Sequence, residues 1–120
     1  PKVVLDVCHN LDGFKYIIKQ IKIENFKKLI FVMGFVKGRD IGQIFSILPS
    51  EAYYFISQPN IERAYSIEKI RSKLHSLNLK IVYSETLNDA YFKALNLSSK
   101  DDLIILTGSN FIAQELIDLN

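Results

Sequence analysis

Cysteine and long apolar runs are the features that this sequence has least of. Its 120 residues include one cysteine, so no disulfide can form within the chain, and a reducing compartment, the cytoplasm, is the expected location. The apolar runs reach about six residues at most, far short of the ~20 that span a bilayer. The first residues do not form the pattern of a signal peptide. We therefore expect no membrane partner.

Blocks of like charge are missing as well. The 15 basic and 13 acidic residues leave a net charge of +2 and are spread along the chain, so neither a nucleic-acid-binding tail nor a polybasic anchor is present. With 48% hydrophobic and 23% charged residues the chain has the composition of a globular domain. A chain of this length buries roughly two thirds of its unfolded surface. We predict one monomeric domain over residues 1–120, without a nucleic-acid partner.

Short apolar runs alternate with segments of helical periodicity. The runs are continuous rather than alternating, which is typical of parallel strands that are covered on both faces. Five strands are predicted, at 3–7, 29–33, 53–56, 81–83 and 103–106. Apolar residues at helical spacing predict five helices, over 14–21, 41–48, 67–74, 87–95 and 111–119. This order predicts a doubly wound, Rossmann-like α/β fold: a mostly parallel sheet of five to six strands with helices on both faces.

Polar residues gather in the segments that follow the predicted strands, where open α/β sheets bind their ligands. At the opposite edge of the sheet, we expect the loop over 22–28 to carry only residues that contact solvent. The candidates after the strands are His9, Asn10 and Asp12; Gly34, Lys37, Gly38, Arg39 and Asp40; Ser57, Gln58, Asn60 and Arg63; and Thr107, Gly108, Ser109 and Asn110. Asp6 lies at the carboxyl end of the first predicted strand.

Several familiar catalytic arrangements are excluded by geometry or spacing. Cys8 and His9 are neighbours on a predicted strand and point to opposite faces, so they cannot form a nucleophile–base pair, and Cys8 reads as a small buried residue. One cysteine with His9 and His75 lacks the spacing of a zinc site. No P-loop or dinucleotide-binding glycine motif occurs. We predict no catalytic residue and no metal ligand in this chain.

The polar residues beside the predicted helices have two possible roles. They can cap helix N-termini, and the candidates for that role are Asn10 or Asp12, and Ser109 or Asn110. Alternatively, the N–H groups and positive dipole ends of those helices face the same rim as Lys37 and Arg39, a setting suited to an anion.

Three stretches in order, "LDVCHNLDGF", "MGFVKGRDI" and "DDLIILTGSNFIAQEL", carry a resemblance to a known family. The chain resembles the C-terminal domain of folylpolyglutamate synthase/dihydrofolate synthase, in the Mur ligase superfamily. That family's pattern is Asp-x-Ala-His-Asn-Pro, a later Asp-Lys-Asp loop, an Arg-Ala pair and a Thr-Gly-Ser turn. The resemblance runs from about Leu5 to Leu116.

The resemblance implies an ATP-dependent amide ligase. A folate or dihydropteroate carboxylate would be phosphorylated to an acyl phosphate, which the amino group of glutamate then attacks. ATP and Mg²⁺ would be used by the full-length enzyme, and the N-terminal ATPase domain of the same polypeptide would be the partner of this domain. The chain begins at Pro1, without an initiator Met, so we expect a fragment. Because it has no P-loop and none of the central-domain ligands for magnesium, we expect it to be inactive alone.

The resemblance also implies roles for residues. Asp6 would lie on the ribose side of the nucleotide, His9 and Asn10 on the side of the phosphates and the amino acid, and Ser109 would help to hold the incoming amino acid. Lys37, Arg39 and Asp40 would supply loop electrostatics, and Arg63, of an Arg63-Ala64 pair, would only orient its loop.

Four positions depart from the family pattern. Cys8 and Leu11 replace Ala and Pro, which changes packing and backbone preorganisation but removes no donor. Gly38 and Arg39 replace the first two residues of Asp-Lys-Asp, so an acid is lost from that loop.

Two other functions stay open at this point. One is a different Mur-type ligase, although we find no motif for a diamino acid. The other is a stand-alone flavodoxin-like binding or regulatory domain. A receiver domain would need an acidic pair after the first strand and a Lys after the last, and Asp6 with Thr107-Gly108-Ser109 does not fit.

Overall fold

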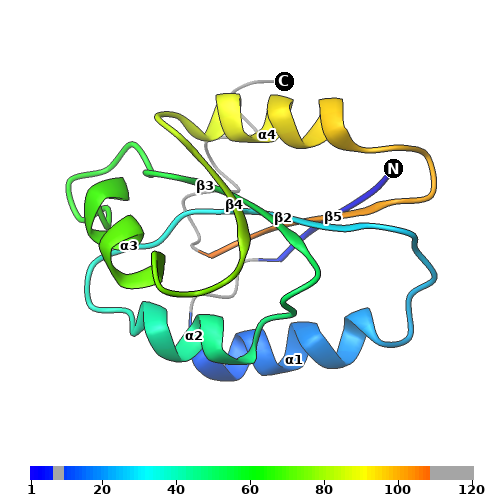
Figure 1. Cartoon of the computed structure of the whole chain (residues 1–120), viewed down its shortest axis with the longest axis horizontal. Coiled ribbons are helices and arrows are strands. Elements are labelled where there is room, and N and C mark those ends of the chain that lie inside the picture. Colours follow the sequence, from blue (N-terminus) through cyan, green and yellow to red (C-terminus); the bar gives the residue numbers. More distant parts are fainter. Residues whose placement is uncertain (7–9, 109–120) are drawn as a thin grey trace.

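A five-stranded parallel sheet forms the centre of the molecule (Figure 1). The computed structural model describes residues 1–6 and 10–108. The sheet order is β1-β5-β2-β3-β4, and every neighbouring pair is parallel. The strands are β1 (Lys2–Leu5), β2 (Leu29–Met33), β3 (Tyr53–Ser57), β4 (Lys80–Ser84) and β5 (Leu103–Thr107). The predicted α/β sheet is confirmed, but β1 ends at Leu5, earlier than predicted.

Helices cover both faces of the sheet, as predicted. The helices of the described residues are α1 (Leu11–Ile21), α2 (Ile41–Ile47), α3 (Ile67–Leu74) and α4 (Leu87–Leu97). Buried residues of α1, α2 and α3 share one hydrophobic cluster, whereas those of α4 belong to a second cluster on the other face. Figure 1 shows α4 on the opposite side of the sheet from α1 and α2. The helix predicted over 111–119 lies outside the described residues.

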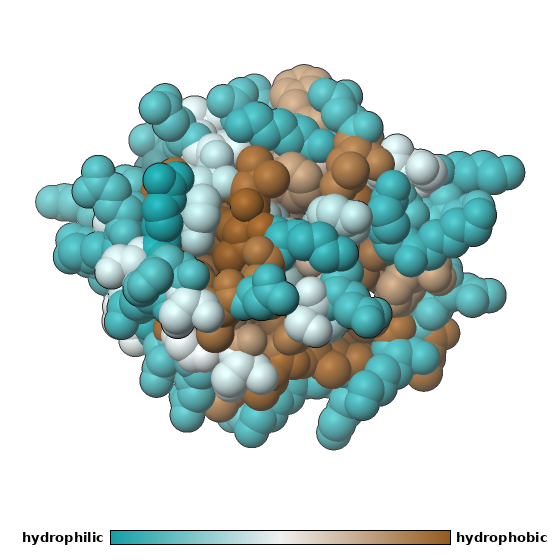
Figure 2. Space-filling model, in the orientation of Figure 1, coloured by the Kyte–Doolittle hydropathy of each residue, from teal (hydrophilic) through white to brown (hydrophobic). Residues whose placement is uncertain are grey.

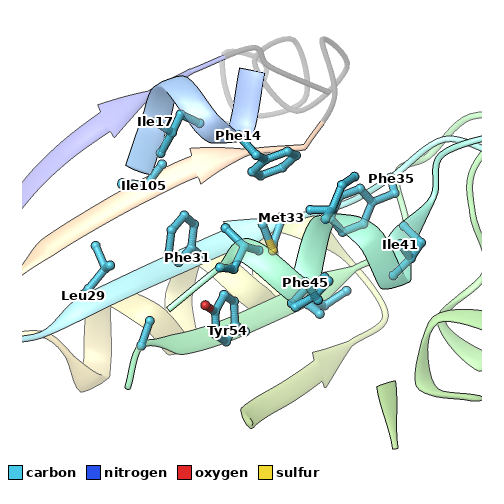
Figure 3. Close-up of a cluster of buried hydrophobic side chains, with 14 of the residues drawn as sticks. Phe14, Ile17, Leu29, Phe31, Met33, Phe35, Ile41, Phe45, Tyr54 and Ile105 are labelled. Atoms are coloured by element: carbon cyan, nitrogen blue, oxygen red, sulfur yellow. The ribbon is translucent and has the colours of Figure 1, made fainter. Parts of the chain in front are cut away.

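The continuous apolar run of β2 is explained by this two-sided cover. Phe31 and Met33 belong to the cluster beneath α1, α2 and α3, and Val32 belongs to the cluster beneath α4. Phe31 stacks on Tyr54 with ring centroids 5.2 Å apart, and Phe45 packs edge-on against Tyr54 at 5.3 Å (Figure 3). Such aromatic pairs add to the stabilisation that burial gives. The aromatic centre therefore joins β2, β3 and α2.

The two edge strands are less protected than the central ones. All residues of β2 and β5 are buried, whereas Val3 and Leu5 of β1 and Val82 of β4 are exposed. Figure 2 shows apolar residues reaching the surface in the middle of one face, among hydrophilic neighbours. The sequence pattern did not distinguish edge strands from central ones, because all five runs are apolar.

A buried carboxylate joins the amino ends of β2 and β5. Asp102 is 3% exposed, and its side chain accepts hydrogen bonds from the backbone N–H groups of Lys28 at 2.9 Å and Ser99 at 2.7 Å. The Lys28 ammonium lies 3.3 Å from the same carboxylate. Burial acts to raise the pKa of Asp102, but these hydrogen bonds and the Lys28 charge outweigh it, and the pKa lies below its usual value. The expectation that the 22–28 loop only meets solvent is wrong at Lys28.

Candidate functional site at the carboxyl edge of the sheet

The sheet order brings the first and last strands together. β5 is inserted between β1 and β2, so the segments that follow these three strands lie side by side. The Asp6 N–H donates to the Leu106 carbonyl at 2.9 Å, and Met33 is in register with Thr107. Asp6, Thr107 and the segment that begins at Gly34 therefore meet at the carboxyl edge, where open α/β sheets bind ligands.

Two glycines allow the backbones to touch at this edge. Gly108 has φ of +115°, and a Cβ atom added there would lie 2.3 Å from the Gly34 carbonyl oxygen. A Cβ atom on Gly34 would lie 3.0 Å from the ring of Pro59 and from the Ser57 carbonyl oxygen. A side chain at Gly108 would therefore require both a strained backbone and separation of the two segments. The sequence pattern predicts that both glycines lie in loops, but it does not indicate that the loops touch.

Asn10 and Asp40 act as helix caps. Asn10 Oδ1 accepts the Gly13 N–H at 2.9 Å, and Asp40 Oδ1 accepts the Gln43 N–H at 3.0 Å. Asn10 is thus the cap of α1, which decides between it and Asp12. Each cap uses one side-chain oxygen, so the amide nitrogen of Asn10 and the second oxygen of Asp40 are not consumed by capping.

Asp6 lines a small cavity among β1, β5 and α1. Its residue is half-buried, and it lines a cavity of about 140 Å³ together with Val4, Ile17 and Gln20, among others. Asp6 was predicted at the carboxyl end of a strand over 3–7, and the structure places it one residue beyond the end of β1. The resemblance also assigns His9 to the nucleotide and the amino acid, and Ser109 to the amino acid. Both residues lie outside the described part of the chain.

The loop after β2 is fastened to the loop after β3. Val36 forms an antiparallel bridge with Ala64. On either side of it, the Lys37 N–H donates to the Arg63 carbonyl at 2.8 Å and the Tyr65 N–H donates to the Phe35 carbonyl at 2.7 Å. The loop carrying Lys37, Arg39 and Asp40 is therefore fixed by backbone contacts, and Arg63 lies opposite Lys37.

A wider cleft opens at the carboxyl ends of β3 and β4. Its volume is about 520 Å³, and its walls include Gln58 after β3, Glu85 after β4, and Arg71 of α3. The Arg71 guanidinium lies 4.7 Å from the centre of the Tyr83 ring. Burial raises the pKa of Tyr83, and the Arg71 charge opposes that rise. No residue of this cleft other than Gln58 was among the sequence candidates.

Within residues 1–6 and 10–108, no group of three or more His, Cys, Asp or Glu side chains could hold a metal ion. In the same part of the chain, no helix is both long and apolar enough to cross a membrane.

The fold and this edge define an open parallel α/β domain whose polar groups collect beyond the carboxyl ends of its strands. A family model described as "Mur ligase, glutamate ligase domain" matches residues 1–110, and the chain belongs to that family. The resemblance stated from the sequence is confirmed at this level.

Curated relatives carry one recurring name. The dihydrofolate synthase/folylpolyglutamate synthase of Buchnera aphidicola subsp. Schizaphis graminum is 26% identical over 121 residues, which is 99% of this chain and 28% of the relative. The protein of the same name from Buchnera aphidicola subsp. Acyrthosiphon pisum is 29% identical, covering 99% of this chain and 29% of the relative. The chain therefore spans less than a third of the length of these relatives.

Solved structures share the fold. A Mycobacterium tuberculosis folylpolyglutamate synthase complexed with ADP matches with a TM-score of 0.88 and 22% identity, over 99% of this chain and 30% of that one. E. coli FolC in complex with DHPP and ADP matches with a TM-score of 0.84 and 20% identity, over 99% and 29%. At these sequence identities the comparison shows that the chains share a fold.

Proposed function

We propose that this chain is the C-terminal domain of an ATP-dependent ligase that adds glutamate to a folate or dihydropteroate carboxylate. Membership of the glutamate ligase domain family and the names of the relatives support the proposal. The structural observation that carries it is the meeting of Asp6, Gly108 and the Gly34 segment at one edge. The motif segments of the resemblance are far apart in sequence, yet they reach this edge together.

The reaction sets the tasks of the site. The γ-phosphoryl group of ATP passes to the acceptor carboxylate, which gives an acyl phosphate and ADP. The amino group of glutamate then attacks the acyl carbon, phosphate leaves, and an amide and a proton are formed. The site must therefore hold a nucleotide, a carboxylate acid and an amino acid close together, because positioning supplies much of the catalysis in such transfers.

Residue roles follow the resemblance. Asp6 contacts the ribose side of the nucleotide, His9 and Asn10 line its phosphates, and His9 and Ser109 hold the amino acid. The loop cations Lys37 and Arg39 oppose the negative charge of the substrates, while Asp40 holds the start of α2 through its cap. None of these residues is proposed to act as a nucleophile or a general base.

The remaining machinery lies in a partner. This chain has no P-loop, and its described residues offer no group of metal-ligating side chains. We propose that an ATPase domain preceding this one in the same polypeptide grips the triphosphate and holds the Mg²⁺. This C-terminal domain closes over that ATPase domain and has no ligase activity alone. The single cysteine supports a cytoplasmic location.

The test is ligation by the full-length protein. Asp6→Ala should lower kcat/KM for ATP-dependent glutamate addition by at least tenfold while the melting temperature stays close to that of the parent. Asp101→Ala, an acid on the opposite edge of the sheet, is the matched control and should leave ligation unchanged. Wild-type turnover in Asp6→Ala would remove Asp6 from the site. A preference for an amino acid other than glutamate would assign the chain to another Mur-type ligase.

A further inference from the structure

Two cations face each other at the carboxyl edge. The bridge between Val36 and Ala64 is antiparallel, so the residues on either side of it are also opposed, and Lys37 pairs with Arg63. Side chains that are directly opposite in an antiparallel pair lie on the same face, with Cβ atoms about 5 Å apart. Both residues are exposed. Backbone hydrogen bonds thus hold Lys37 beside Arg63, and the two cationic side chains start from neighbouring positions on one face.

This pair has no acidic partner among the described residues. No ion pair or side-chain hydrogen bond joins Lys37 or Arg63 to any other residue of 1–6 and 10–108, and the nearby Asp40 uses one oxygen to cap α2. Three ion pairs between described residues lie at the opposite edge of the sheet: Lys2–Glu24, Lys27–Asp101 and Lys28–Asp102. Like charges directly opposite one another are destabilising. Lys37 and Arg63 therefore place two like charges on one face, and neither forms an ion pair with a described acid.

Arg39 adds a donor on the same loop. Its Nε atom is buried and has no hydrogen-bond partner among the described residues. A buried donor without an acceptor is unfavourable, so an oxygen acceptor at this atom would be stabilising. Between Lys37 and Arg39, Gly38 has φ of +93° and no atom within 4 Å of an added Cβ. Space is therefore open beside the loop.

We infer that Lys37 and Arg63, assisted by Arg39, form an oxyanion site that accepts a ligand with at least two closely spaced anionic groups. The guanidinium group of arginine and the ammonium group of lysine bind phosphate and carboxylate groups through charge-assisted hydrogen bonds. The ligand groups are either phosphates of a nucleotide or carboxylates of a short polyglutamate. The naming of these two ligands, a nucleotide and a polyglutamate, rests on the proposed function. The site extends that function by giving Arg63 a binding role, whereas the resemblance implied only that Arg63 orients its loop.

Anion binding to the 120-residue chain tests the site directly. Tripolyphosphate and triglutamate are titrated separately by calorimetry at low salt against the parent chain, Lys37→Gln, Arg63→Gln and the control Lys100→Gln. Lys100 is an exposed lysine outside this edge. We expect each site variant to lose about 3-fold to 10-fold in affinity, which corresponds to about 0.7 to 1.4 kcal/mol, and the control to lose none.

The two probes separate the sources. Tighter binding of tripolyphosphate assigns the site to nucleotide phosphates, and tighter binding of triglutamate assigns it to the carboxylates of a polyglutamate. Equal affinity of all four proteins for both probes would overturn the proposal. Because no ligation is measured, this result is independent of the activity test of the proposed function.

Thermal melting gives a second test, because an anion site and a purely structural role predict opposite changes in the melting temperature of the variants. Removing one of two opposed cations should raise the melting temperature of the ligand-free chain at low salt, and the difference should shrink at high salt because charges are screened. A fall in melting temperature for both variants, with unchanged anion affinity, would show that the side chains serve the loop alone. Lys37→Gln answers the question even if Arg63→Gln fails to fold.

Discussion

Removal of the Asp102 carboxylate should destabilise the fold more than any other single change to a charged residue at the amino edge. Asp102 is almost completely buried and accepts the backbone N–H groups of Lys28 and Ser99 as well as the Lys28 ammonium. Through these bonds it fastens the start of β2 to the turn before β5. Asp102→Ala leaves two backbone donors without their acceptor.

The expected loss follows from those two donors. Each buried donor left unsatisfied costs about 1–3 kcal/mol, so the two donors together predict that Asp102→Ala lowers the free energy of unfolding by about 2–6 kcal/mol. Asp102→Asn keeps the volume and one oxygen, but its amide NH₂ cannot accept the second N–H, so we expect about half of that loss. With a urea m value of about 1–3 kcal/mol/M, the unfolding midpoint of Asp102→Ala should fall by on the order of 1 M.

Urea unfolding followed by circular dichroism measures these values, and Asp101→Asn is the matched control. The neighbouring Asp101 side chain is 50% exposed, and its ion pair with Lys27 spans 3.7 Å. Exposed pairs contribute about 0–1 kcal/mol. A loss in Asp101→Asn as large as that in Asp102→Asn would refute the argument from burial and hydrogen bonding.

The stabilisation that Asp102 provides should depend on pH in a defined direction. Because the pKa of Asp102 is lowered in the folded state, its carboxylate stabilises the fold fully above the unfolded pKa of about 4. That stabilisation is lost as the pH falls below this value through the folded pKa. The stability difference between the parent chain and Asp102→Asn should therefore be full at pH 7 and narrow below about pH 4. A difference that stays constant down to pH 3 would contradict the hydrogen-bonded carboxylate.

Further predictions concern the glycines, a buried tyrosine and a cap. Gly108→Ala should cost more stability than Gly38→Ala in urea unfolding: both have positive φ, worth about 1–2 kcal/mol of strain, but only Gly108 abuts Gly34. Equal losses would mean that the contact does not matter. Tyr54→Phe should cost about 1 kcal/mol, because the hydroxyl donates to the Pro49 carbonyl; an unchanged midpoint would refute this. Asn10→Ala should cost about 1 kcal/mol through the α1 cap, measured the same way.

The sequence by itself determined the elements and their arrangement in layers. The run Leu29–Met33 is apolar throughout, and the structure buries it on both faces. The spacing of Phe14, Ile17 and Ile21 predicted the buried stripe of α1. The cap of α1 could be predicted to within a pair of residues, Asn10 or Asp12, because an Asx side chain before an amphipathic segment bonds the first turn of that same segment. These are local properties, governed by neighbours three or four residues away.

Tertiary structure decided what meets at the carboxyl edge. Nothing in the order of the runs indicates that β5, last along the chain, is inserted between β1 and β2. The approach of Gly108 to Gly34, the hydrogen bonds from Lys28 to Asp102 and the opposition of Lys37 to Arg63 all join segments far apart in sequence. Helix and strand periodicity report only which face of an element is apolar. The choice of neighbours depends on how five similar strands pack together, and a single sequence carries no local signal for that choice.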